Sequence, residues 1–370
     1  MDERASRALD VLRSPTSGPD DIRPALRSLV DVETLAVVSS AMLTGVEAGR
    51  SSITDAAGRA LAAARRPEEV AVAHFLAALA AEHEGDVAAG EEHVHAAAAA
   101  TPEWPAAVDR LAWYESDRGH AADALRLWRR IGVGPGDFEW EMLAPFAEEG
   151  RTRPARNEPC WCGSGRKFKS CHLGVSLEAS LPDRVPWLRD KAACFVRRRD
   201  DSSLADLEAL AGARAGDGDE EEVDIAWQDP LVMDVALAER GWFARFLEAR
   251  RPLLPTDEAE LARTWLGVTR SLFRVDEVSP GVGLKATDLL AGASLDVRDR
   301  AYSRHARVGS VVCGRAVPDS VGHQFLPGLV AVPGDEVEAV RALVERGDGV
   351  GLLGYLAGEA PGGADDEIRG

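Results

Sequence analysis

The chain contains the segment Arg156-Asn-Glu-Pro-Cys160-Trp-Cys162-Gly-Ser-Gly165-Arg-Lys-Phe-Lys-Ser-Cys171-His172, which decides how its middle part can fold. Three of the five cysteines lie in it, spaced as C-x-C, eight residues and then C-H. Thiolates and a neutral imidazole are the ligands of closed, tetrahedral structural zinc sites. Gly163 and Gly165 can adopt the positive φ angles that the return turn between the ligand pairs needs. The segment therefore predicts one structural zinc ion, with the ligands Cys160, Cys162, Cys171 and His172.

A disulfide, or a group of small core residues, is the alternative interpretation of these cysteines. Disulfides form in oxidising compartments, and the start Met1-Asp-Glu-Arg-Ala-Ser has no apolar run that could export the chain. Protein side chains fill all four ligand positions, which favours a structural over a catalytic zinc ion. Cys194 and Cys313 lie outside the segment in apolar surroundings, so we expect both to be buried, inert thiols.

The segment resembles the SEC-C motif, a small zinc module first described at the C-terminus of the SecA preprotein translocase ATPase. The pattern of that motif is close to R-N-D-P-C-P-C-G-S-G-K-K-Y-K-x-C-H, and its turn positions fall on Gly163, Ser164 and Gly165. Trp161 stands where the family usually has proline, and Leu173 stands where glycine usually follows the histidine. Neither departure removes a ligand. The resemblance covers only about residues 155 to 174.

The resemblance implies a contact with another protein, because the module of SecA binds protein partners, notably the SecB chaperone. The motors that make SecA an ATPase are missing from this chain, so translocase activity is not implied. The side chain of Trp161 must face something, which makes it a candidate contact residue.

Charge separates this segment from the rest of the chain. The net charge of -19 and the pI near 4.9 disfavour nucleic acid and anionic membranes as partners. The stretch from Arg151 to His172, by contrast, contains six basic residues and one acidic residue, which gives a local net charge of +5. This basic surface predicts contact with an acidic protein partner, whereas a solvated basic loop is the alternative. The candidate contact residues are Trp161, Arg166, Lys167 and Lys169.

Upstream of the segment, amphipathic helices alternate with glycine and proline punctuation. Gly85 and Gly119 lie 34 positions apart in two similar stretches, and 34 residues is the tetratricopeptide period. The small residues Gly90 and Ala124 are similar to those at the packing positions of that family, although its first-helix tryptophan is missing. We therefore expect a degenerate tetratricopeptide-like repeat. An ordinary antiparallel bundle of alanine-rich helices is the alternative.

Downstream, the period of the pattern changes along the chain. Pro182 to Arg197 has helical spacing, and Gly212 to Glu222 has the glycine and charge content of an acidic flexible loop. Beyond Gly267 apolar residues alternate with polar ones, which predicts four or five short strands in a small antiparallel barrel of the SH3 or OB kind. Asp335 to Glu345 is expected to form a terminal helix.

The predicted fold is multidomain and mainly α-helical, with a small α+β part. Its parts are a helical-repeat domain at 1–150, a zinc knuckle at 151–175, a helical segment at 176–266 containing the acidic loop 212–222, a barrel-like region with a terminal helix at 267–358, and a disordered tail at 359–370.

Sequence motifs of the common enzyme classes are missing. The chain contains no phosphate-binding G-x-x-x-x-G-K-[ST] loop, no G-x-G-x-x-G after a strand and no H-E-x-x-H. It also has no run of ~18 to 20 apolar residues that would span a membrane. We expect a cytoplasmic, zinc-binding adaptor with a protein partner. An enzyme with its site in the C-terminal α+β region is the alternative, and nucleic-acid binding is the third hypothesis.

Overall fold

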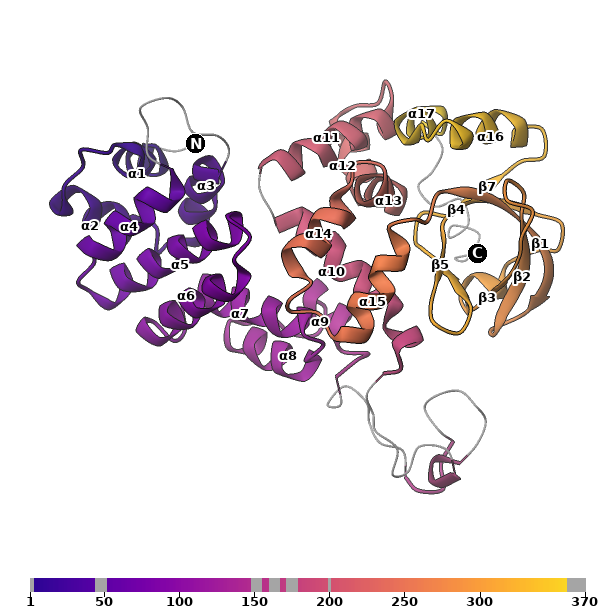
Figure 1. Ribbon diagram of the computed structural model, residues 1–370, viewed down its shortest axis with the longest axis horizontal. Coiled ribbons are helices and arrows are strands. Elements are labelled where there is room, and N and C mark those ends of the chain that lie inside the picture. The colour runs from indigo at the N-terminus through magenta and orange to yellow at the C-terminus, as the bar shows by residue number, and fades with distance from the viewer. Residues whose placement is uncertain are drawn as a thin grey trace. The chain divides into compact units, whose positions relative to one another are not determined.

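The computed structural model describes residues 3–43, 52–147, 155–159, 167–170, 179–198 and 201–357. The chain forms two compact units. The first contains residues 1–187 and 252–255, and the second contains residues 188–251 and 256–370. Most of the described residues are helical, and a curled sheet lies in the C-terminal part (Figure 1).

The first unit is built mainly from helices. They are α1 (Glu3–Arg13), α2 (Pro19–Ser28), α3 (Val32–Leu43), α4 (Ile53–Ala63), α5 (Pro67–His83), α6 (Val87–Ala100), α7 (Pro105–Asp117), α8 (Ala121–Arg130) and α9 (Phe138–Leu143), with the 3-10 turns η2 (Phe168–Ser170) and η3 (Leu181–Arg184). Proline begins α2, α5 and α7, where its fixed φ suits a first helical residue and its missing N–H has no partner to lose. The longest helix, α5, has 17 residues. None of the helices that the structure describes is long and apolar enough to cross a bilayer.

Consecutive helices of this unit pack as hairpins, α5 with α6 and α7 with α8 (Figure 1). The turn of the first hairpin contains Gly85, with φ of 87°, and the turn of the second contains Gly119, with φ of 81°. Left-handed backbone of this kind favours glycine after a helix. The two glycines that stand 34 positions apart therefore occupy equivalent turns.

Gly90 sets the separation between α5 and α6. It is buried in α6, and a Cβ atom added there would lie 2.9 Å from Glu82 Cγ and 3.3 Å from the carbonyl oxygen of Ala78. Tyr114 of α7 also packs at this position, since its hydroxyl donates to the carboxylate of Glu82. The three helices can pack this closely because position 90 has no side chain.

The second unit begins within α10 (Val185–Arg198), and five further helices precede its sheet. These are α11 (Asp201–Ala215), α12 (Glu220–Gln228), α13 (Pro230–Ala238), α14 (Trp242–Arg250) and α15 (Thr256–Trp265). The pair Asp229-Pro230 starts α13: the Asp229 carboxylate caps the helix by accepting the Leu231 N–H at 2.8 Å, and proline occupies its first position.

The prediction of an acidic flexible loop at 212–222 is wrong. Most of this stretch is helical, with only residues 216–219 between α11 and α12. Asp219 caps α12 by accepting the N–H groups of Glu221 and Glu222. The glutamates of the first turn lie at the positive end of the helix dipole, which favours negative charge. The favourable interaction of the glutamates with the helix dipole outweighs their mutual repulsion.

Seven strands form the C-terminal sheet, in the order β5-β6-β3-β2-β1-β4-β7. Their bounds are β1 (Ser271–Ser279), β2 (Gly283–Asp288), β3 (Ser294–Val297), β4 (Val311–Gly314), β5 (Ala316–Pro318), β6 (His323–Phe325) and β7 (Val330–Val332). The sheet curls around a core that includes Phe273, Ala286, Val312 and Phe325 (Figure 1). Two helices follow it, α16 (Val337–Glu345) and α17 (Gly349–Tyr355).

The expected small sheet is therefore present, but it is mixed and not purely antiparallel. β3 and β6 pair in parallel through Val297 and His323. A tight hairpin forces its two strands to be antiparallel, whereas η4 (Tyr302–Arg304), β4 and β5 all lie between β3 and β6 in the sequence. The long connection removes that constraint, and the alternation of apolar residues alone does not report strand direction.

Substitution of Gly90 tests the close contact between α5 and α6. We expect Gly90→Ala to lower the free energy of unfolding by about 1–3 kcal/mol, because the new Cβ overpacks the interface. Gly58→Ala on the exposed side of α4 is the matched control, since nothing lies within 4 Å of its added Cβ. The control should stabilise the protein by about 0.5–1 kcal/mol. Thermal unfolding followed by circular dichroism checks both, and equal effects of the two variants would contradict this account.

Candidate functional site

The described parts of the cysteine segment lie side by side. Pro159 and Lys167 form an antiparallel bridge. The Phe168 N–H donates to the carbonyl of Glu158 at 2.8 Å, and the Lys169 N–H donates to the carbonyl of Arg156 at 3.0 Å. These backbone bonds hold the chain before Cys160 against the chain before Cys171, so the segment returns on itself as a zinc knuckle requires.

Side chains alternate in exposure along this return. Lys167 and Lys169 are exposed, whereas Phe168 between them is buried. Of the predicted contact residues, these two lysines are therefore accessible. The predicted ligands Cys160, Cys162, Cys171 and His172, and the predicted contacts Trp161 and Arg166, lie outside the described residues.

Among the described residues, one group of histidine and carboxylate side chains is close enough together to hold a metal ion, namely Glu115, His120 and Asp123. The His120 ring lies 2.7 Å from a Glu115 oxygen. The Glu115 carboxylate also pairs with Arg118 at 3.7 Å, and Asp123 pairs with Arg126. Surface ion pairs account for this group without a metal.

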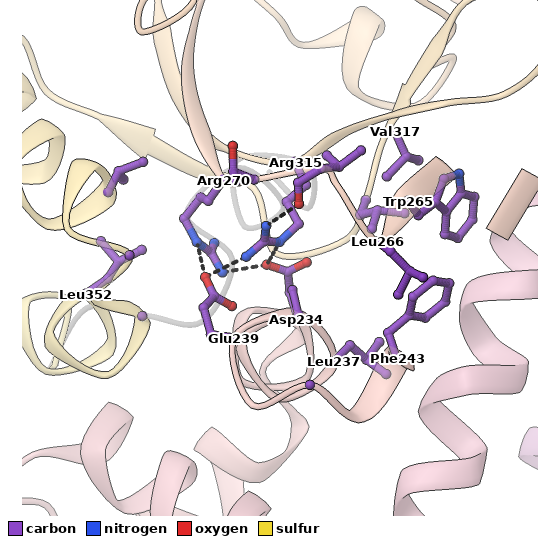
Figure 2. Close-up of a pocket in the computed structure, with 18 of the residues that line it drawn as sticks. Asp234, Leu237, Glu239, Phe243, Trp265, Leu266, Arg270, Arg315, Val317 and Leu352 are labelled. Carbon is purple, nitrogen blue, oxygen red and sulfur yellow. Dashed lines mark hydrogen bonds and ion pairs between the residues drawn. The ribbon is translucent and has the colours of Figure 1, made fainter. Parts of the chain in front are cut away.

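A cavity of about 650 Å³ lies within the second unit. The end of α13, the start of α14 and the end of α15 contribute to its wall, together with the chain before β1, strand β5 and the loop between α16 and α17 (Figure 2). The cavity is therefore built where three helices meet one side of the sheet and the terminal helix pair.

One aspartate, one glutamate and two arginines form an ionic cluster in this cavity (Figure 2). Asp234 Oδ2 accepts from Arg270 Nη2 and, at 3.1 Å, from Arg315 Nε. Glu239 Oε1 pairs with Arg270 Nε at 3.3 Å and with Arg315 Nη2. Arg315 Nη1 also donates to the carbonyl of Val268 at 3.0 Å.

Burial makes this cluster energetically important. Asp234, Arg270 and Arg315 are only 5%, 6% and 5% exposed. Burial opposes the charge of Arg270, but the neighbouring carboxylates of Asp234 and Glu239 outweigh it and raise the pKa of the guanidinium. Removing one partner from such a cluster leaves an uncompensated buried charge, which costs about 3–5 kcal/mol.

Three polar atoms of the cluster are left without a complete set of hydrogen bonds. Arg270 Nη1 and Glu239 Oε2 are buried and have no partner among the described residues. Both arginines donate to the same oxygen of Asp234, and Figure 2 shows the other oxygen pointing away from them, toward Leu266 and Phe243. An unsatisfied buried polar group costs about 1–3 kcal/mol, so the cluster has unused hydrogen-bonding capacity.

The other side of the cavity is apolar. Phe243 and Trp265 stack there, with ring centroids 5.6 Å apart, and Figure 2 places Leu237, Leu266 and Val317 around them. Leu266 is 53% exposed, so part of this apolar wall is open to water. The cavity therefore combines a polar cluster with an aromatic and aliphatic wall, as small-molecule sites commonly do.

No local sequence pattern indicates this cluster. Asp234 comes from a helix, Arg270 from the chain before the sheet and Arg315 from between β4 and β5, so only the fold brings them together.

The expectation for the two cysteines outside the SEC-C segment is confirmed: Cys194 and Cys313 are buried free thiols. Burial raises the pKa of Cys194 to about 12 and that of Cys313 to about 11.

Comparison with known proteins identifies the cysteine segment. The SEC-C motif model matches residues 156–174, so the predicted resemblance is confirmed. The protein translocase subunit SecA of Frankia casuarinae is 47% identical over 49 residues, which make up 12% of this chain and 5% of that protein. No solved structure matches the chain. The likeness to SecA is thus confined to a short stretch.

Removal of one arginine tests the role of the ionic cluster. Arg315→Met should lower the free energy of unfolding by about 3–5 kcal/mol, because two buried carboxylates would then share one guanidinium. Arg274→Met is the control, since Arg274 pairs with Asp276 on the surface, where the two side chains are 49% and 30% exposed. We expect less than about 1 kcal/mol for the control. Urea unfolding measured by circular dichroism distinguishes them, and a small effect at position 315 would show that the cluster is dispensable.

Proposed function

We propose that this protein is a cytoplasmic, zinc-binding adaptor that recognises an acidic protein partner. The match of the SEC-C motif to residues 156–174 carries the proposal. The matched segment contains the three cysteines and the histidine in zinc-ligand spacing, and its described ends are held together by backbone hydrogen bonds. A protein translocase subunit is similar to 49 residues of the chain, a part too small to transfer the activity of that protein.

The donor set fits a structural zinc ion. Three thiolates and one imidazole supplied by Cys160, Cys162, Cys171 and His172 would fill a tetrahedral site and leave no position for water. Zinc would stabilise the local fold of the knuckle. The thiols must stay reduced to bind metal, and a reducing cytoplasm keeps them so.

A basic surface on the knuckle supports contact with an acidic partner. Lys167 and Lys169 are exposed on the returning chain, and the sequence places Trp161 and Arg166 in the same short segment. The rest of the chain is acidic, with a net charge of -19 overall, so a nucleic acid would be repelled by most of the protein. A protein partner that meets only the knuckle would avoid this repulsion.

The helical hairpins of the first unit supply a second proposed contact surface. We regard α5–α6 and α7–α8 as degenerate tetratricopeptide-like repeats, with Gly85 and Gly119 in equivalent turns. Stacked helix pairs of this type form extended binding surfaces. The knuckle and the repeats would then engage one partner through two modest contacts in place of one large one.

Metal analysis tests the zinc site. The purified protein should contain one zinc ion per chain, and Cys171→Ser should remove it while most of the helical signal and the main thermal transition remain. The zinc would close only short loops between neighbouring ligands, so it would not tie distant segments together. Cys194→Ala is the control and should keep its zinc, because Cys194 is buried in α10. A wild-type zinc content well below one, unchanged after zinc is added, would refute the site.

Charge reversal tests the proposed contact. Lys167→Glu with Lys169→Glu should weaken capture of the partner at least about tenfold while zinc is retained, because two cations that face an acidic surface are replaced by anions. Arg251→Glu with Arg263→Glu, at exposed positions of the second unit, is the matched control. Affinity purification from the native cell, with identification and quantification of co-eluting proteins, provides the readout. Unchanged capture by the knuckle variant would exclude the lysines as a contact.

A further inference from the structure

We propose that the cavity of the second unit is a binding site for a neutral, mainly aromatic small molecule that carries an N–H or O–H donor. The cavity lies entirely in residues 188–251 and 256–370, so this site is independent of the SEC-C segment and of the adaptor function. Its size, its apolar wall, the free oxygen of Asp234 and its charge balance each narrow the class of ligand.

The size and the wall of the cavity suit an aromatic ligand. A volume of about 650 Å³ falls in the range of about 300–1,000 Å³ that is typical of small-molecule sites. Phe243 and Trp265, stacked on each other, form part of its aromatic wall. Leu266, 53% exposed beside them, would lose contact with water when a ring covers it.

The free oxygen of Asp234 favours a hydrogen-bond donor on the ligand. One oxygen of Asp234 points toward the apolar side (Figure 2), and both of the hydrogen bonds that the arginines donate to this carboxylate go to its other oxygen. Oε2 of Glu239 and Nη1 of Arg270 have no partner among the described residues either, but both atoms are buried, so the oxygen of Asp234 is the one that a ligand can meet. An N–H or O–H group attached to a ring against Phe243 would meet the free oxygen of Asp234.

The charge balance of the site favours a neutral ligand. Asp234 and Glu239 are already neutralised by Arg270 and Arg315. The charged residues of the whole lining balance as well, four acidic and four basic: Asp234, Glu239, Glu345, Asp348, Arg189, Arg270, Arg315 and Arg346. An added ammonium or carboxylate would leave an unbalanced charge beside these buried ion pairs, which is unfavourable.

Calorimetric titration of the full chain with four probes tests the ligand class. The probes are indole, a neutral ring with an N–H donor; benzofuran, of the same shape without the donor; tryptamine, with an added ammonium; and indole-3-acetate, with an added carboxylate. We expect indole to bind with a dissociation constant below about 1 mM and at least about tenfold more tightly than benzofuran, because benzofuran leaves the Asp234 oxygen unpaired. Tryptamine and indole-3-acetate should both bind more weakly than indole.

A variant that fills the cavity locates the binding. Ala238 lines the cavity and is exposed, so Ala238→Phe adds a ring to the site without disturbing the core. It should weaken indole binding at least about tenfold and leave thermal unfolding unchanged. Ala205→Phe, at an exposed position of α11 outside the cavity, is the matched control and should bind indole like the wild type.

Other outcomes would overturn the proposal. Equal affinity for indole and benzofuran would show that no donor is recognised, and tighter binding of tryptamine or indole-3-acetate would show that the ligand is charged. No indole binding at millimolar concentration would exclude a site for aromatic donors. Retained binding in the Ala238→Phe protein, with its thermal unfolding unchanged, would place the ligand elsewhere.

Discussion

The buried pairing of two carboxylates on the helices with two arginines from the sheet region holds the second unit together. Asp234 and Glu239 stand on and just after α13, whereas Arg270 precedes β1 and Arg315 links β4 to β5. Removing the partners of any of the four would strongly destabilise the unit, because all four side chains lie largely out of water. The orientation of α13 against the strands is therefore fixed by ion pairs whose geometry is more specific than that of apolar contacts. A second buried pair, Arg214 with Asp229, anchors the start of the same helix.

The two units use different physical means to fold. In the first, alanines and Gly90 let helices approach until backbone and short side chains touch. In the second, aromatic rings and buried ions fill the space between the helices and the curled sheet. The SEC-C segment belongs to neither type, since it is short and lacks a large apolar face, and metal ligation would supply the stabilisation that burial cannot. Local interactions would thus make the motif recognisable in proteins that share little else.

The parts of the molecule that sequence reasoning could predict depend on neighbours in the chain. The SEC-C motif, the turns at Gly85 and Gly119 and the start of α13 at Asp229 are all encoded within a few residues. The parallel pairing of β3 with β6 could not be predicted, because the alternation of apolar residues is the same for either strand direction. The cavity was also unpredictable, since its polar atoms come from segments about 35 to 80 positions apart. The acidic run at the start of α12 was not recognised as helical, because like charges suggest disorder unless the helix start that they stabilise is identified.

The two cysteines outside the SEC-C segment have a practical consequence. Cys194 and Cys313 are free and buried, and the pKa of each thiol is raised, to about 12 and about 11. At neutral pH these side chains are therefore almost entirely protonated, whereas the thiolate is the form that reacts with alkylating reagents. In the folded protein such reagents would therefore report on the three remaining cysteines. Zinc bound there would protect them, so the rate of thiol labelling under native conditions would report whether these cysteines hold a metal ion.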